Sequence, residues 1–225
     1  MRQPILAPPH TVESSGIGPL GNAIEHAGIP LGTLASGEPV LTRLFSGAGR
    51  QVVSVGNPLA VMLALRAIQA RATVHVSLKN RTPWQRVLEH EGGELARHLR
   101  IDDNSDISSS TVASFVHPVL RVVDVPAAGS PGSPLSAWSS RVMVIHRLDT
   151  MALPTLRSAD LVLTGTLTRD QAIAACPILR LPSEAIEVLS NLPPTTIAAV
   201  AEGEILQVSV QPTQWEWRLL QAAGS

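Results

Sequence analysis

Two polar residues at the end of an apolar strand are the first candidates for chemistry. The segment Arg141–His146 is mostly Val, Met and Ile, which predicts a buried strand ending in His146, and Asp149 follows three residues later. Sites in α/β proteins form at the carboxyl ends of parallel strands, where this pair is expected. A Ser–His–Asp hydrolase would also need the motif G-x-S-x-G, which the sequence lacks. The competing interpretation is a histidine with a structural hydrogen bond.

The second candidate is a junction between a strand and a helix. The Val-rich run Gln51–Val55 predicts a short strand, and the Ala- and Leu-rich run Pro58–Ala72 predicts a helix. Asn57 suits the cap of that helix, and Pro58 suits its first position. Phosphate groups bind at such junctions when glycines let the backbone approach closely. Here Gly56 is the single glycine of the junction.

The motifs that would assign a nucleotide cofactor are incomplete. Neither G-x-G-x-x-G nor G-x-x-x-x-G-K-[ST] occurs in the sequence. We therefore expect no cofactor and assign no catalytic residue. If a small ligand binds at all, we expect its cleft to contain Gly56, Asn57, His146 and Asp149, because all four lie at predicted strand ends.

A metal site is not predicted either. Asp102–Asp106 begins with the D-x-N-x-D spacing of a calcium loop, but Ile107 and Ala113 replace the glycine and glutamate that such a loop needs at its sixth and twelfth positions. A solvated acidic loop is the expected structure. Cys176 is the single cysteine, so no intramolecular disulfide and no multi-cysteine zinc site can form. No H-x-x-x-H or H-E-x-x-H spacing occurs.

Composition limits the partners and the domain organisation. The chain has 225 residues and a net charge of −1, so it shows no electrostatic signature of nucleic-acid binding. No apolar run reaches the roughly 18–20 residues that span a bilayer, so the chain as given is expected to be soluble. Residues 1–27 are rich in Pro and Gly and predict a flexible lead-in. Residues 28–225 predict a single domain.

The predicted elements indicate an α/β fold. Gln51–Val55, the following helix and Thr73–Ser77 form one βαβ unit, which requires a parallel sheet. Further strands are expected at Leu120–Val125 and Asp160–Gly165. The expected architecture is a Rossmann-like three-layer sandwich, with a mainly parallel sheet and antiparallel hairpins at its edges. One hairpin is expected where Ser46–Gly49 joins the strand Pro39–Phe45 to the strand at Val52.

The C-terminal residues predict an antiparallel meander. Thr196–Val200 and Ile205–Val210 are two of its strands, and Trp215–Leu220 is expected to be the third because Trp and charged residues alternate there. A helix capped by Thr213 with Glu216 is the alternative, since these residues have the spacing of a capping box.

Several segments together resemble one known family. The first two segments form a hairpin that ends in a Gly-rich turn. A Val-rich strand, a helix, a second strand and the start of a helix with Pro and Trp follow in that order. The segments are Gly28–Gly32, Gly37–Phe45, Val52–Gly56, Leu63–Ala67, Ala72–Val76, Pro83–Trp84 and Ala159–Leu163. This order resembles the cytosolic region of EccE, a membrane-complex component of the actinobacterial type VII (ESX) secretion system. Proteins of that family carry N-terminal transmembrane helices, and none is expected in this sequence.

The resemblance implies a function in protein transport. The expected function is a non-enzymatic domain at the cytoplasmic face of the cell membrane, where it acts as an interaction scaffold for other secretion-complex subunits. Membrane association would then come only through a segment absent from this chain. The alternative is a Rossmann-like domain that binds a nucleotide or sugar nucleotide, as in a glycosyltransferase. Nucleic acid is not an expected partner.

Overall fold

The computed structural model describes residues 6–7, 28–91, 93, 95–102, 112–124 and 134–224. The predicted lead-in therefore lies outside the described residues except for Leu6–Ala7, and the predicted acidic loop lies outside them after Asp102. No helix in the described ranges has the length and apolar character needed to cross a bilayer. The elements, in chain order, are β1 (Leu6–Ala7), β2 (Ile29–Thr33), β3 (Pro39–Thr42), β4 (Arg50–Val55), α2 (Asn57–Gln69), β5 (Thr73–Ser77), α3 (Thr82–Glu91), α4 (Leu95–His98), β6 (Leu99–Ile101), β7 (Val119–Asp124), β8 (Ser139–Ile145), α5 (Leu153–Arg157), β9 (Leu161–Thr164), α6 (Arg169–Ile178), α7 (Ala185–Ser190), β10 (Thr196–Ala201), β11 (Glu204–Ser209) and α8 (Gln214–Gly224).

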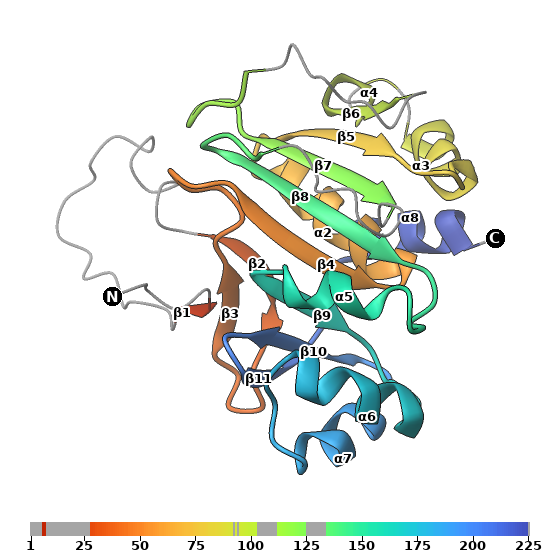
Figure 1. Ribbon diagram of the computed structural model, residues 1–225. Helices are drawn as coiled ribbons and strands as arrows, with labels where there is room; N and C mark the ends of the chain where they lie inside the picture. The colour runs from red at the N-terminus through yellow and green to blue at the C-terminus, as the bar shows by residue number, and fades with distance from the viewer. Residues whose placement is uncertain are drawn as a thin grey trace, which may run out of the picture.

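One twisted sheet contains the strands of the described residues. Eleven strands lie in the order β1-β3-β2-β11-β10-β9-β4-β8-β7-β5-β6 (Figure 1). Neighbours are parallel from β9 through β4 to β6. From β9 to β1 they are antiparallel. The predicted α/β class, with a parallel sheet that continues into antiparallel strands toward one edge, is confirmed.

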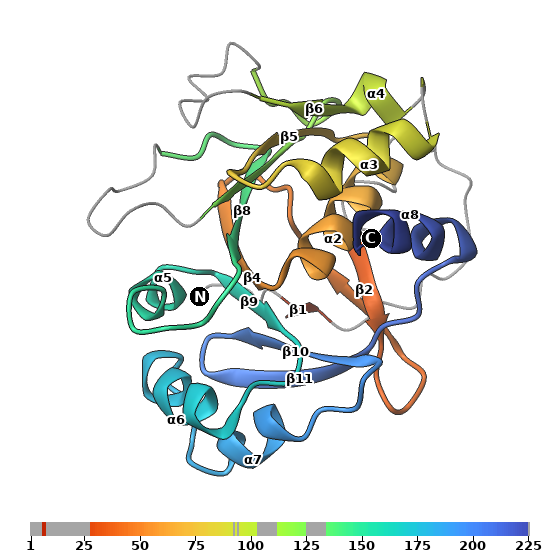
Figure 2. The ribbon, with the colours of Figure 1, turned by 90° about the vertical axis from the view of Figure 1, so that its right-hand side faces the viewer.

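Helices cover both faces of the sheet and complete the expected three layers. On one face α2, α3 and α8 bury the larger apolar cluster, which includes Val61, Leu65 and Trp84. On the other face α5, α6 and α7 bury a second cluster around Val53, Met143 and Leu156. Figure 2 shows α2, α3 and α8 on one side of the strands and α5, α6 and α7 on the other.

The strands β4 and β5 and the helix α2 form the predicted βαβ unit. The connection from β4 to β5 and the connection from β8 to β9 run toward opposite edges of the sheet. The strands β8 and β7 lie between β4 and β5, so the first crossover skips two positions, whereas β9 returns to the opposite side of β4. The helix α2 follows β4 onto one face, and α5 follows β8 onto the other. The carboxyl ends of β4 and β8 are therefore the switch point of the sheet, where ligands bind in open α/β folds.

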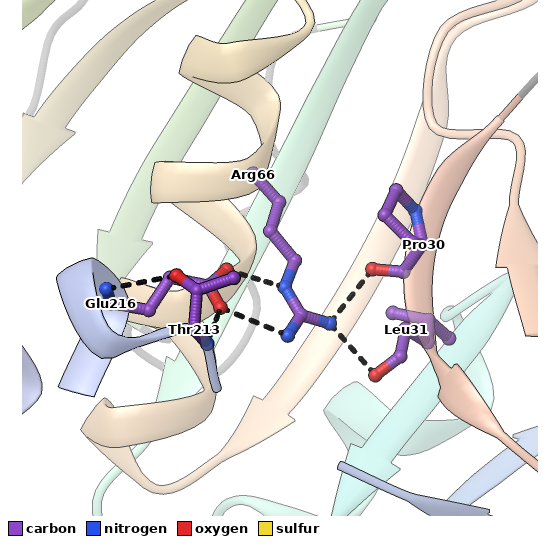
Figure 3. A network of polar contacts seen from close by, with 5 residues as sticks. All are labelled: Pro30, Leu31, Arg66, Thr213 and Glu216. Carbon is purple, nitrogen blue, oxygen red and sulfur yellow. Dashed lines mark hydrogen bonds and ion pairs between the residues drawn. The ribbon is translucent and has the colours of Figure 1, made fainter. Parts of the chain in front are cut away.

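A buried ion pair joins the last helix to this unit. The Arg66 Nε donates to Glu216 Oε1 at 2.6 Å, and its Nη1 donates to the carbonyls of Pro30 and Leu31 at 2.9 and 2.8 Å (Figure 3). The Glu216 Oε2 accepts the backbone N–H of Thr213 at 2.8 Å, and the Thr213 hydroxyl accepts the N–H of Glu216. The network connects α8 to α2 and β2.

Two predicted elements differ from the structure. The expected hairpin between Pro39–Phe45 and the strand at Val52 is wrong, because β3 pairs with β2 and β1, whereas β4 pairs with β8 and β9. The expected strand Trp215–Leu220 is also wrong, because these residues belong to helix α8. The alternative prediction, a helix capped by Thr213 and Glu216, is confirmed by the reciprocal hydrogen bonds.

Candidate functional site

The β4–α2 junction combines an unusual backbone conformation with an uncapped helix start. Gly56 has φ 98° and ψ 141°, a conformation that a side chain disfavours, and a Cβ there would contact only the Pro58 Cδ, at an ordinary 3.8 Å. Its N–H donates to the Ile145 carbonyl at 2.9 Å, which fixes the junction beside the end of β8. No side chain caps the 13-residue helix α2. Its first N–H groups and positive dipole end are thus available at the carboxyl edge of the sheet.

Asn57 contributes a buried polar atom to the same junction. Its Oδ1 is fully covered and has no hydrogen-bond partner in the structure. An acceptor in this position suits a ligand donor such as a hydroxyl or an amine. Pro58 follows in the first turn and supplies no N–H, so Asn57 and Leu59 carry the orphan donors of this turn.

A carboxylate–imidazole pair lies at the ends of the neighbouring strands. The Asp124 Oδ1 at the end of β7 is 3.0 Å from Nε2 of His146, which directly follows β8. The other oxygen of Asp124 accepts the Lys79 backbone N–H at 2.6 Å, just beyond β5. One carboxylate therefore ties three strand ends together and orients the imidazole. The His146 side chain is 49% exposed, so a ligand at this edge can reach the ring.

Asp149, the fourth predicted residue, has a different role. Its Oδ1 accepts the N–H groups of Met151 and Ala152, both at 3.0 Å. It thereby organises the turn before α5 instead of pairing with His146. Gly56 lies beside His146 through the Ile145 contact, and Asn57 begins the adjoining helix. A common ligand cleft for the predicted residues stays a prediction.

Sequence analysis missed Asp124, although it ends a strand that was predicted correctly. Its importance depends on β7 lying directly beside β8, where Asp124 pairs in register with Val144. The spacing along the chain cannot reveal that contact, because 22 residues separate Asp124 from His146. The usable signal was an acidic residue at the end of an apolar run.

Two other features lie away from this edge. A groove of about 210 Å³ between α5 and α6 is lined by Thr150, Leu153, Pro154, Arg157 and Ile178, none of which belongs to the strand-end group. Cys176 is buried in α6. Burial raises the pKa of its thiol, which keeps it protonated and matches the expected core residue better than a nucleophile.

Comparison with known proteins identifies the fold but no family. No protein-family model matches the chain, and no curated protein matches it. Among solved structures, VirB4 of Thermoanaerobacter pseudethanolicus is similar with a TM-score of 0.56 and 11% identity, over 85% of this chain and 98% of VirB4. The pCW3 conjugation coupling protein TcpA, in its monomer form with ATPγS, gives a TM-score of 0.55 and 9% identity, over 83% of this chain and 66% of TcpA.

A third similar structure is also a complex with a nucleotide analogue. The genome packaging NTPase B204 of Sulfolobus turreted icosahedral virus 2, in complex with AMPPCP, gives a TM-score of 0.51 and 10% identity. The match covers 73% of this chain and 98% of B204. At these identities the likeness concerns the fold alone, and it does not identify the chain as EccE.

These findings correct the expected function. The prediction of a non-enzymatic interaction scaffold is wrong, and so is the prediction that the chain is not an enzyme, because structures with this fold include an NTPase and a coupling protein with bound nucleotide analogues. The alternative prediction, a nucleotide-binding domain, fits the comparisons better.

Proposed function

We propose that this chain binds a nucleoside triphosphate at the carboxyl edge of β4, β8 and β7 and hydrolyses it slowly. The observation that carries the proposal is the uncapped start of α2, whose N-cap Gly56 is hydrogen-bonded to Ile145, the residue before the His146 that Asp124 orients. The fold shared with TcpA and B204, both with nucleotide analogues, supports the same ligand class.

The phosphates are proposed to lie against the first turn of α2. Backbone N–H groups and the helix dipole favour an anion there. Gly56 has no Cβ, and the position of one would contact only the Pro58 Cδ at 3.8 Å, so a phosphate oxygen can approach the backbone. The buried Asn57 Oδ1 is an acceptor, so it would receive a donor from the sugar or the base. That requirement favours a nucleotide over free phosphate.

His146 is proposed to accept the proton of the attacking water. With Nε2–H donating to Asp124, the Nδ1 lone pair remains as the acceptor. The water oxygen would form a bond to the terminal phosphorus, the bridging P–O bond would break, and the nucleoside diphosphate would leave. The junction Gly56–Asn57–Pro58 supplies no lysine for the developing charge. We therefore expect turnover below about 1 per second, the lower end of the ordinary range.

The biological setting is part of the same proposal. The segment order that resembles EccE and the fold likeness to the coupling protein TcpA both favour work in a multi-subunit transport assembly. We place the domain at the cytoplasmic face of the membrane, in contact with other subunits, as a nucleotide-dependent component.

The test combines binding and turnover. The purified chain is titrated with a fluorescent ATP analogue, and phosphate release is followed with ATP and with a nucleotide sugar as separate substrates. We expect saturable ATP binding, with release that falls at least about tenfold in His146→Ala while binding persists. The matched control is His90→Ala, which removes an exposed histidine of α3. Absence of ATP binding, or equal turnover in His146→Ala and the control, would contradict the proposal.

A further inference from the structure

The amino edge of the parallel sheet carries positive charge in segments that contain no acid. Neighbouring strands are parallel from β4 to β6, so the segments that precede these strands lie together at the edge opposite the proposed nucleotide site (Figure 1). Three arginines and no acidic residue occur in the described segments, which are residues 46–50, 70–72, 95–98, 112–118 and 134–138. Asp160, which precedes β9 at the same edge, accepts the backbone N–H of Gln51 at 2.8 Å.

The three arginines of this edge are Arg50, Arg71 and Arg97, and their charges are available to a partner. Arg71 and Arg97 are exposed, and Arg50 is half-buried at the start of β4. No hydrogen bond or ion pair joins their guanidinium groups to another residue in the described part of the chain. The edge from β4 to β6 covers four strand spacings of about 4.8 Å, roughly 19 Å in all. The charges are thus spread along one edge, which suits an extended anionic surface.

Aromatic and aliphatic side chains occupy the middle of the same edge. Phe115 and Trp138, which precede β7 and β8, are half-buried and pack edge to face with ring centroids 5.3 Å apart. Val112 and Val116, in the segment of Phe115, are 85% and 64% exposed. Apolar side chains that gather on a surface in this way mark a site of contact with a protein or a membrane.

The backbone of Trp138 holds this apolar patch in a fixed place at a conformational cost. Its φ of 61° lies in the left-handed region, which is unfavourable for a bulky residue. Its N–H donates to the Ser46 carbonyl at 2.7 Å, and its carbonyl accepts the N–H of Val119 at 3.1 Å. Such conformations persist where surrounding contacts impose them, and they cluster at functional sites. Here they fix the indole between the β3–β4 connection and the start of β7.

We propose that the amino edge of the sheet docks on the surface of an anionic lipid bilayer. Trp138 and Val116 enter the interfacial region, and the three arginines face the lipid phosphates. Tryptophan is favoured at the membrane–water interface because its ring is apolar and its N–H is polar. Cationic side chains near the surface are attracted by anionic headgroups. The exposed valines favour a bilayer over a nucleic acid, whose bases stack on aromatic rings.

The proposed contact is independent of the nucleotide site. It needs no membrane-spanning helix, and it leaves the carboxyl edge of the sheet open toward the side away from the bilayer. Each arginine near an anionic surface strengthens binding about fivefold, so three arginines and a shallow apolar contact predict reversible attachment.

The test measures binding of the full chain to lipid vesicles without nucleotide. Vesicles of phosphatidylcholine alone, and of phosphatidylcholine with one third phosphatidylglycerol, are sedimented with the protein at low salt. We expect binding to the anionic vesicles and little binding to the neutral ones. Most of the binding should be lost at about 1 M NaCl, because salt screens the charges. Bound protein should show a blue shift of tryptophan fluorescence, which Trp138→Phe reduces.

Matched variants locate the contact on the molecule. Arg97→Gln is expected to weaken binding to anionic vesicles about fivefold, whereas Arg157→Gln makes the same charge change at an exposed position of α5 and leaves binding unchanged. Val116→Asp is expected to weaken binding about tenfold or more, because an apolar side chain no longer enters the bilayer. The control Ile173→Asp, at a 49% exposed position of α6, should bind like the unmodified chain.

Three results would overturn the proposal. They are absence of binding to anionic vesicles, equal binding to neutral and anionic vesicles, and equal binding by Val116→Asp and Ile173→Asp. A fluorescent single-stranded oligonucleotide is titrated in parallel. If it binds in a way that Arg97→Gln weakens while the vesicles do not bind, the edge belongs to a nucleic-acid site and the proposal is wrong.

Discussion

Removal of the Glu216 charge tests how the last helix is held on the protein. Arg66 is 6% exposed and Glu216 is 1% exposed. They make two contacts, Nε to Oε1 at 2.6 Å and Nη2 to Oε2 at 3.2 Å. Glu216→Gln keeps the shape of the side chain and an acceptor for the helix cap. It leaves the guanidinium with the carbonyls of Pro30 and Leu31 but without a negative charge.

The expected cost follows from the buried cation that remains. Breaking a buried ion pair by changing one partner costs about 3–5 kcal/mol. Because Gln retains part of the hydrogen bonding, we expect Glu216→Gln to lower the free energy of unfolding by about 3 kcal/mol. For a chain of this length that corresponds to a decrease of roughly 6–12 °C in the melting temperature. The exposed pair Arg169–Glu187 is the control, and Glu187→Gln should cost no more than about 1 kcal/mol.

The assay is urea unfolding at pH 7, followed by circular dichroism, on a double-mutant cycle. We expect Arg66→Met together with Glu216→Gln to cost at least about 2 kcal/mol less than the sum of the single changes, because the double variant buries no unpaired charge. A cost below about 1 kcal/mol for Glu216→Gln, or additivity within about 0.5 kcal/mol, would refute this account of the network.

Three further predictions follow from local geometry. Burial raises the pKa of Glu216, but the hydrogen bonds from Arg66 and Thr213 outweigh burial and leave this pKa below its ordinary value. As the pH falls, the unfolded chain therefore takes up the proton before the folded chain does. The contribution of Glu216 to the free energy of unfolding is full above about pH 4.3 and decreases below it. Between about pH 5 and pH 3, the free energy of unfolding should fall more steeply with pH for the natural chain than for Glu216→Gln. Gly56→Ala should cost about 1–3 kcal/mol because φ is 98°, whereas Gly165→Ala should be near neutral in the same urea assay. Thr168→Ala removes the capping box of α6 and should cost about 1 kcal/mol of unfolding free energy; an unchanged midpoint would exclude that role.

The central part of the fold was predictable because its signals are local. A Val-rich run favours the strand β4, and the Ala- and Leu-rich run that follows favours the helix α2. Gly56 and Asn57 lie between the two runs and mark the boundary. The apolar run before His146 likewise predicts β8. Such patterns extend over a few residues and require no knowledge of strand order.

The errors arose where a local pattern fits both a strand and a helix, or where a contact depends on the order of strands that are distant in the sequence. Trp215 and Trp217 alternate with charged residues, as in a strand, yet in α8 Trp215 packs on the core and Trp217 is 54% exposed. The hydrogen bond that the buried Glu216 accepts from Arg66 favours the helix over the strand. Arg66 lies 150 residues away in the sequence, so the local pattern could not reveal this contact. Asp124 was overlooked for the same reason, since its contact with His146 exists only because β7 and β8 are neighbours.

Hydrogen exchange with and without saturating ATP tests the central claim most directly. If nucleotide phosphates lie on the first turn of α2, the amides of Asn57 and Leu59 should exchange more slowly with ATP, as should the segment that begins at His146. In Gly56→Ala this protection should weaken, whereas Gly165→Ala should retain it. Unchanged exchange at the start of α2 under saturating ATP, or protection confined to the groove between α5 and α6, would contradict a nucleotide site at the switch point of the sheet.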